Sequence, residues 1–192
     1  MSKVGIFGGT FDPIHLGHLI TAQSVREIRK LEKIIFIPAY ISPHKSDIKT
    51  SSADDRLNMI KLAIEGISFF EYSDMEIRKG GVSFTVDTLR ELKEKYENLE
   101  FIVGYDNIFT FNTWRDPDEI MNLATIVVLK RKSSHPPEFK DKYYNQAVFV
   151  QTRGIEISAT DLRERVKKEL PINFLVPPKV MEYIYNHKLY VD

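Results

Sequence analysis

The stretch GGTFDPIHLGH, from Gly8 to His18, follows the apolar residues Val4 to Phe7 and precedes a segment whose apolar residues recur every three or four positions. Val4 to Phe7 is typical of a buried strand, and the periodic segment predicts a helix. A glycine-rich turn between a strand and a helix lets backbone N–H groups approach phosphate oxygens, and the helix N-terminus adds partial positive charge. His15 and His18 add donors for the charge that develops on a reacting phosphoryl group. The stretch therefore predicts phosphoryl or nucleotidyl chemistry.

Apolar patterns along the rest of the chain alternate between strand and helix. The predicted strands cover residues 4–7, 33–38, 69–77, 99–103, 124–129 and 148–151. The predicted helices cover residues 16–28, 86–96, 160–169 and 178–187, and a further helix starts after a Ser51 or Ser52 cap, with Leu57, Ile60 and Ile64 on its apolar face. A short helical stretch precedes Trp114, and residues 40–52 and 132–145 are predicted polar loops. This alternation predicts an α/β fold, with a parallel sheet covered by helices on both faces. Ligands of such sheets bind outside the carboxyl ends of the strands, where the strand order reverses.

The composition is that of an ordinary globular protein, and the 192 residues predict a single domain over 1–192. The absence of cysteine excludes disulfides and thiolate metal sites and favours a reducing cytoplasm. No signal-peptide pattern or membrane-spanning apolar run occurs, so we expect a cytoplasmic protein with no membrane partner. Lys plus Arg and Asp plus Glu number 27 each, and this zero net charge argues against a nucleic-acid partner. An anionic substrate must then be held by a local cluster of basic groups.

A second motif, ISATDLR from Ile157 to Arg163, lies at the start of the predicted helix 160–169. Ser158 and Thr160 are typical N-cap residues, which is a purely structural interpretation. The same turn also offers hydroxyl and N–H groups to phosphate, with Arg163 as a charged clamp.

Together the two stretches resemble the signature of the nucleotidyltransferase superfamily, whose first half ends in His-x-Gly-His and whose second half reads Ile-Ser-Ser-Thr-x-Ile-Arg. The resemblance implies a Rossmann-like doubly wound sheet that binds ATP. By this resemblance His18 stabilises the α-phosphate, His15 assists at the β- or γ-phosphate, and Arg163 completes the catalytic set. The implied ATP-binding residues are Gly8, Gly9, Thr10, Phe11, His15, His18, Asp106, Ser158, Thr160 and Arg163. Ala159 departs from the usual serine of the second half.

The histidines leave two other interpretations. One is a pair of helix-capping histidines without a ligand, against which the matching glycines and the Asp12-Pro13 pair argue. The other is a zinc site formed by His15, His18 and His44, which are ligands of a suitable type. No clear fourth ligand or carboxylate base occurs at metalloenzyme spacing, so we predict no metal site built from protein ligands.

Further stretches resemble the bacterial nicotinate-nucleotide adenylyltransferase family, and the resemblance extends from Val4 to Arg163. They are Pro43-His44-Lys45, Ser83 to Leu89, and Gly104-Tyr105-Asp106 with Trp114-Arg115. The resemblance implies adenylyl transfer from ATP to nicotinate mononucleotide, giving nicotinic acid adenine dinucleotide and pyrophosphate, with Mg²⁺ bound mainly through the ATP phosphates. The implied mononucleotide-binding residues are His44, Lys45, Thr85, Trp114, Arg115 and Arg131. The chain departs from the family pattern at Ile41-Ser42-Pro43, at Phe84 and at Arg131-Lys132-Ser133.

The chemistry of these side chains agrees with that assignment. Trp114, the single tryptophan, can stack on the electron-poor pyridinium ring, although a core position is the structural alternative. Thr85, as the N-cap of the predicted helix 86–96, would bring helix N–H groups to the nicotinate carboxylate and so favour the acid over the neutral amide. Lys45 and Arg131 are candidate partners of the mononucleotide phosphate, or solvated surface charges. Asp106 is a candidate acceptor for a ribose hydroxyl, or a helix cap.

Several alternatives stay open at this point. Related adenylyltransferases act on nicotinamide mononucleotide, phosphopantetheine or glycerol 3-phosphate, and Trp114 argues against the last two. A non-catalytic nucleotide-binding regulator would have no need of His15, His18 and Arg163. An RNA-binding module would require a basic face, against which the zero net charge counts. A homo-oligomer is possible.

Overall fold

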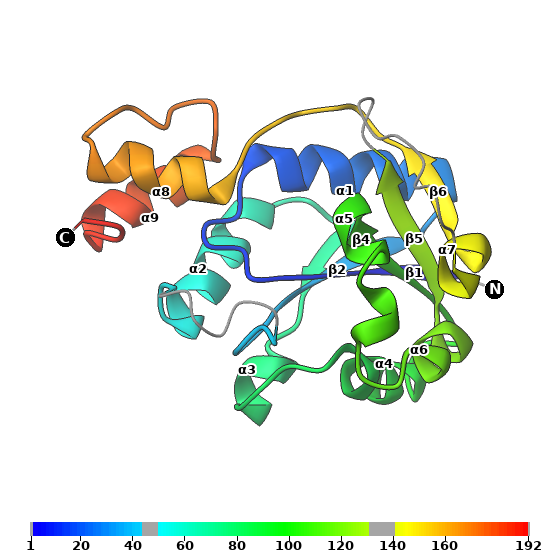
Figure 1. Cartoon of the computed structure of the whole chain (residues 1–192). Coiled ribbons are helices and arrows are strands. Elements are labelled where there is room, and N and C mark those ends of the chain that lie inside the picture. Colours follow the sequence, from blue (N-terminus) through cyan, green and yellow to red (C-terminus); the bar gives the residue numbers. More distant parts are fainter. Residues whose placement is uncertain (1, 44–49, 131–140, 192) are drawn as a thin grey trace.

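A parallel sheet lies between two layers of helices (Figure 1). The computed structural model describes residues 2–43, 50–130 and 141–191. Within them, six strands pair in the order β3-β2-β1-β4-β5-β6, and every neighbouring pair is parallel. The strands are β1 (Lys3–Gly9), β2 (Lys33–Pro38), β3 (Phe70–Tyr72), β4 (Asn98–Gly104), β5 (Thr125–Lys130) and β6 (Val148–Gln151). The predicted α/β fold with a doubly wound parallel sheet is confirmed.

The helices follow the strands in the order expected of a doubly wound fold. They are α1 (Leu16–Arg29), α2 (Ala53–Ile64), α3 (Met75–Lys79), α4 (Thr85–Lys93), α5 (Tyr105–Ile108), α6 (Pro117–Leu123), α7 (Lys142–Gln146), α8 (Ala159–Lys167) and α9 (Pro178–Asn186), with a 3-10 turn η1 (Phe111–Thr113). In the described part of the chain, no helix combines the length and the apolar character needed to cross a membrane.

Two hydrophobic clusters form because successive strand residues point to opposite faces of the sheet. Phe7 of β1 belongs to the cluster built with α1, α2, α8 and α9, whereas its neighbour Ile6 belongs to the cluster built with α3, α4, α5 and α6. Figure 1 shows α1 on one side of the strands and α4 and α6 on the other. The switch of helices from one face to the other separates the half of the sheet formed by β1, β2 and β3 from the half formed by β4, β5 and β6.

Three segments differ from the prediction, and each has a local cause. The predicted strand 69–77 ends early, because the Asp74 carbonyl accepts the Arg78 N–H and starts α3. The missed helix α6 begins at Pro117, and a proline in the first turn is a helix-start signal. The predicted loop 132–145 overlaps α7, whose start is capped when Asp141 accepts the Tyr144 N–H at 2.8 Å. The other residues of that predicted loop, up to 140, lie outside the described residues.

Gly5 in β1 is required by close packing, which gives a test of the sheet. A Cβ atom at this position would lie 2.8 Å from Leu31 Cδ1 and 3.0 Å from Ile34 Cγ1. We expect Gly5→Ala to lower the free energy of unfolding by about 1–3 kcal/mol through overpacking. Gly154→Ala, where nothing lies within 4 Å, should change it by less than about 0.5 kcal/mol. Urea denaturation of both variants makes the comparison, and equal effects would contradict the packing argument.

Candidate active site

The carboxyl ends of β1, β2 and β4 meet at one edge of the sheet. Gly9 at the end of β1 is paired with Pro38 at the end of β2, and Phe7 is paired with Ile102 of β4. β1 continues into α1 on one face, whereas β4 leads to helices on the other face. Side chains that follow these strands therefore surround the point where the strand order reverses, which is where such sheets bind ligands.

The turn between β1 and α1 brings the two signature histidines together. His15 is the N-cap of α1, and its backbone N–H donates to Nδ1 of His18 at 3.3 Å. The two rings stack with their centroids 3.7 Å apart. Gly17 permits this arrangement, because a Cβ atom there would lie only 3.0 Å from Nδ1 of His15. Phe11, which has a φ of 52°, packs its ring edge-on against His18.

Burial sets the charge of His15. The side chain is 6% exposed, and burial lowers its pKa to about 4. The ring is therefore neutral near pH 7. Its Nδ1 is buried without a hydrogen-bond partner among the described residues. A buried nitrogen of this kind calls for a partner, and a ligand phosphate that enters the turn would supply one.

The second signature motif lies directly against the first. Nη1 of Arg163 donates to the main-chain carbonyl of Asp12 at 2.7 Å, and Nη2 donates to Oγ1 of Thr160 at 3.2 Å. Ile157 also approaches Gly17, since its Cβ lies 3.6 Å from the position that a glycine Cβ would take. Ser158 is the exposed N-cap of α8, and its side chain makes no capping bond. The two halves of the predicted ATP site, 151 residues apart in the chain, thus form one structure.

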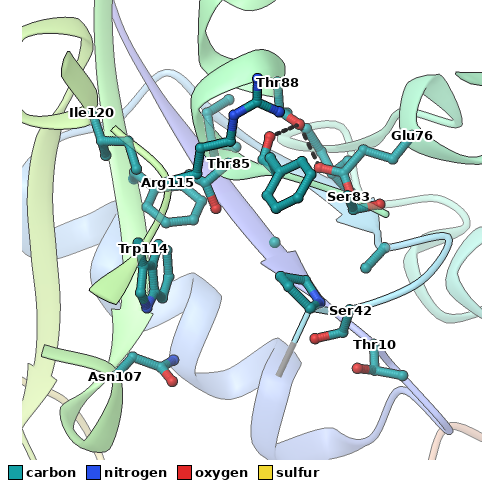
Figure 2. A pocket seen from close by; sticks show the side chains of 18 of the residues that line it. Thr10, Ser42, Glu76, Ser83, Thr85, Thr88, Asn107, Trp114, Arg115 and Ile120 are labelled. Atoms are coloured by element: carbon teal, nitrogen blue, oxygen red, sulfur yellow. Dashed lines mark hydrogen bonds between the residues drawn. The ribbon is translucent and has the colours of Figure 1, made fainter. Parts of the chain in front are cut away.

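A pocket of about 260 Å³ joins the signature turn to the predicted mononucleotide residues. Its lining includes Gly8, Gly9 and Thr10 from the turn, Ser42 and Pro43 from the segment after β2, and Thr85, Trp114 and Arg115. Figure 2 shows Trp114 across the cavity from Ser42 and Thr10. The volume is near the lower end for small-molecule pockets, about 300 Å³ and above, and suits one ring with its substituents.

Trp114 and Arg115 are both held by aromatic neighbours. The Trp114 ring packs against Phe101 and Phe111, with centroids 6.2 and 5.1 Å away. The guanidinium of Arg115 lies 4.8 Å from the centre of the Phe84 ring and 3.6 Å from Oδ2 of Asp87. These contacts orient an indole and a cation at the same wall of the pocket.

Thr85 is the first residue of α4, whereas Phe84 occupies the N-cap, so the predicted capping role of Thr85 is wrong. The reason is that the Phe84 carbonyl already accepts the N–H groups of Asp87 and Thr88 and so begins the helix one residue earlier. The first N–H groups of a helix lack intrahelical acceptors. Thr85 lines the pocket, so the N-terminus of α4 still lies at its wall.

Glu76 of α3 is a carboxyl group in the same pocket that the sequence did not reveal. It accepts a hydrogen bond from Oγ1 of Thr88 at 2.5 Å, and burial raises its pKa above the usual range. Thr88 lies on α4 one turn after Thr85, so this bond ties α3 to the N-terminal turn of α4 (Figure 2). A residue with a raised pKa in a cleft is a common mark of a functional site.

Arg56 of α2 anchors the segments that follow β1 and β2 at the carboxyl edge of the sheet. Its side chain is 1% exposed, and its donors reach the main-chain carbonyls of Thr10, Ala39, Tyr40 and Ser51 at 2.6–3.3 Å. Burial lowers the pKa of this guanidinium, while the nearby Asp12 carboxylate opposes that effect. The sequence did contain a sign that Arg56 is buried: it lies four positions before Ile60, on the apolar stripe of its helix.

The remaining predicted residues divide into two groups. Asp106 is exposed in the first turn of α5 after β4, and its neighbour Asn107, rather than Asp106, lines the pocket. His44, Lys45 and Arg131 lie outside the described residues. Within the residues that the structure describes, no three His, Cys, Asp or Glu side chains form a group that could hold a metal ion.

Comparison with known proteins first places the chain in a class. Residues 6–165 match the family described as Cytidylyltransferase-like. Two solved structures of Plasmodium falciparum nicotinic acid mononucleotide adenylyltransferase share the fold. The one complexed with NaAD has a TM-score of 0.82 at 20% identity, with 99% of this chain and 98% of that chain covered.

Closer relatives define the family. The chain is 39% identical to a protein named "Probable nicotinate-nucleotide adenylyltransferase" in Clostridium perfringens, over 99% of this chain and 98% of the relative. A protein of the same name in Desulfitobacterium hafniense is 41% identical, over 98% and 95% of the two chains. The chain therefore belongs to the nicotinate-nucleotide adenylyltransferase family.

The low pKa of His15 makes stability depend on pH. The unfolded residue takes up a proton below about pH 6.5, whereas the folded one does so only near pH 4, so stability falls as the pH falls through this interval. Between pH 7 and pH 5 we expect the wild type to lose about 2 kcal/mol more free energy of unfolding than His15→Gln. Urea titrations at the two pH values measure both losses. Identical losses would show that burial does not perturb His15.

Proposed function

We propose that this protein transfers the adenylyl group of ATP to nicotinate mononucleotide, giving nicotinic acid adenine dinucleotide and pyrophosphate. The observation that carries the proposal is the single pocket that joins Gly8, Gly9 and Thr10 of the signature turn to Thr85 and Trp114. An enzyme that joins two nucleotides needs a phosphate-binding turn and an acceptor pocket side by side. The family of the chain supports the same reaction.

In this proposal each wall of the pocket binds one part of the mononucleotide. The pyridinium ring stacks on Trp114, whose indole is positioned by Phe101 and Phe111. The nicotinate carboxylate lies at the N-terminus of α4, next to Thr85, where helix N–H groups favour an anion. Arg115 adds positive charge to that wall. His44, Lys45 and Arg131 stay predicted partners of the mononucleotide.

The triphosphate lies between the two signature motifs. Arg163 places its guanidinium beside the signature turn, where it can neutralise phosphate charge. His18 donates to the α-phosphate as that group becomes five-coordinate. His15, neutral and buried, donates to a neighbouring phosphate. Asp106, exposed after β4, stays a predicted acceptor for a ribose hydroxyl.

The reaction is then an in-line displacement. An oxygen of the mononucleotide phosphate attacks the α-phosphorus of ATP, and the bond from that phosphorus to the oxygen bridging to the β-phosphorus breaks. The attacking phosphate already carries negative charge near pH 7, so no strong general base is required. The protein's contribution is to hold two anions in line and to neutralise the charge that develops between them.

Mg²⁺ enters this proposal as a companion of ATP. It would be bound mainly through the triphosphate oxygens, where it offsets negative charge, which is the usual mode for this ion. The described residues offer no cluster of acidic or histidine side chains for it, so no protein ligand is assigned. The cytoplasmic location and a homo-oligomeric state stay predictions from the sequence.

The substrate is tested by pyrophosphate release from ATP with nicotinate mononucleotide and nicotinamide mononucleotide side by side. We expect the acid form to be preferred by about one to two decades in kcat/KM, because a charged acceptor strengthens its hydrogen bonds to the α4 N-terminus. Phosphopantetheine serves as the acceptor that should give no turnover. A preference for the amide would refute the substrate while leaving the adenylyl transfer intact.

The role of His18 is tested by His18→Ala. Loss of one donor to a developing oxyanion lowers kcat by roughly two to three decades. His187→Ala is the matched control, because His187 is exposed at the end of α9 and should leave kcat unchanged. Stopped assays of pyrophosphate release at saturating substrate make the comparison. A near-normal kcat in His18→Ala would remove His18 from the catalytic set.

A further inference from the structure

The residues after α9, from His187 to Tyr190, fold back against the body of the protein. Lys188 and Tyr190 have φ values of 50° and 64°, in the left-handed region that residues other than glycine rarely adopt. The N–H of Leu189 donates to the Ile184 carbonyl at 3.0 Å, and Leu189 and Tyr190 pack against the hydrophobic cluster shared with α1 and α2. Such conformations persist where the surrounding contacts determine them. The tail therefore has a defined path.

That path ends at the signature turn. The hydroxyl of Tyr190 donates to Oδ1 of Asp12 at 2.7 Å, across 178 residues of sequence. Asp12 is 2% exposed, and its other oxygen accepts the Ser51 N–H at 3.3 Å. Burial and the Asp12 carboxylate both raise the pKa of Tyr190, so its hydroxyl keeps its proton and acts as the donor.

Asp12 also holds the second signature motif. The main-chain carbonyl of Asp12 accepts a hydrogen bond from Nη1 of Arg163. Asp12 is therefore bonded to Tyr190 through its side chain and to Arg163 through its backbone. Any shift of Asp12 would move the guanidinium and the turn that leads to His15. A misplacement of about 1 Å between reacting groups lowers a rate strongly, even when every catalytic residue is present.

We propose that Tyr190 is a positioning residue for adenylyl transfer, which acts through its hydrogen bond to Asp12 and thereby fixes Arg163. The inference rests on the proposed function. Nothing in the resemblance or in the signature motifs points to the C-terminal tail. Tyr190 does not line the pocket, so loss of its hydroxyl should leave the wall that binds the mononucleotide unchanged.

The test is Tyr190→Phe, which keeps the ring and removes the hydroxyl. We expect kcat to fall about tenfold and the KM values of ATP and the mononucleotide to change by less than about threefold. The reason is that the Arg163 guanidinium is still present but displaced. Tyr185→Phe is the matched control, a tyrosine of α9 that is 46% exposed, and it should behave as the wild type. A kcat of Tyr190→Phe within twofold of the wild type would overturn the proposal.

A double-mutant cycle separates positioning from general destabilisation. In an Arg163→Ala background, Tyr190→Phe should lower kcat by less than about twofold, since no guanidinium is left to position. The full tenfold loss in that background would overturn the proposal, because the hydroxyl would then act by another route. Melting temperatures of all variants show that the assays compare folded proteins.

Amide hydrogen exchange tests the structural step without any turnover. In Tyr190→Phe, the peptide covering residues 8–19 should exchange faster than in the wild type, and the same peptide should be unchanged in Tyr185→Phe. Unchanged exchange in Tyr190→Phe would overturn the proposal. A wild type that releases no pyrophosphate would refute the proposed function, and the exchange result would still decide whether Tyr190 orders the turn.

Discussion

Parallel pairing on both sides of β1 is the constraint on which the site depends. Because β2 and β4 run in the same direction as β1, their carboxyl ends lie at one edge of the sheet. The chain leaves β1 toward one face and β4 toward the other, so no helix fills the space between the two exits. The signature turn and the Trp114 wall of the pocket border that space.

Around the signature turn, the buried ionisable groups differ from the accessible ones in how their charge is balanced. Arg56 and Asp12 are each almost completely buried, and the proximity of their opposite charges offsets part of the free energy lost by removing them from water. His15 is neutral near pH 7, so its burial removes no charge from water. Among the described residues, Arg163 beside the signature turn stays partly accessible, and Arg115 at the pocket wall is exposed. Under the proposed function, both cations would be available to an anionic ligand.

Local patterns in the sequence predicted the strand–turn–helix at the N-terminus, because apolar periodicity and glycines act over a few neighbouring residues. The family resemblance, rather than local patterns, singled out Thr85 and Trp114; both line one pocket, and Thr85 lies one residue inside α4. α3 was missed because its five residues are too few to show a helical period. The partners of Glu76 and Tyr190 could not be predicted, since their contacts depend on the packing of distant segments. Tertiary contacts of this kind leave no periodic trace.

The hydrogen bonds of Arg56 leave the side chains of the loops that it anchors free to change. Within the described residues, its guanidinium donates to main-chain carbonyls, those of Thr10, Ala39, Tyr40 and Ser51. A carbonyl is present whatever side chain the residue bears, so these loop positions are free to mutate without loosening the anchor. The departures of Ile41 and Ser42 from the family pattern lie in the same loop. One buried cation can therefore maintain the shape of a loop while the side chains of that loop change.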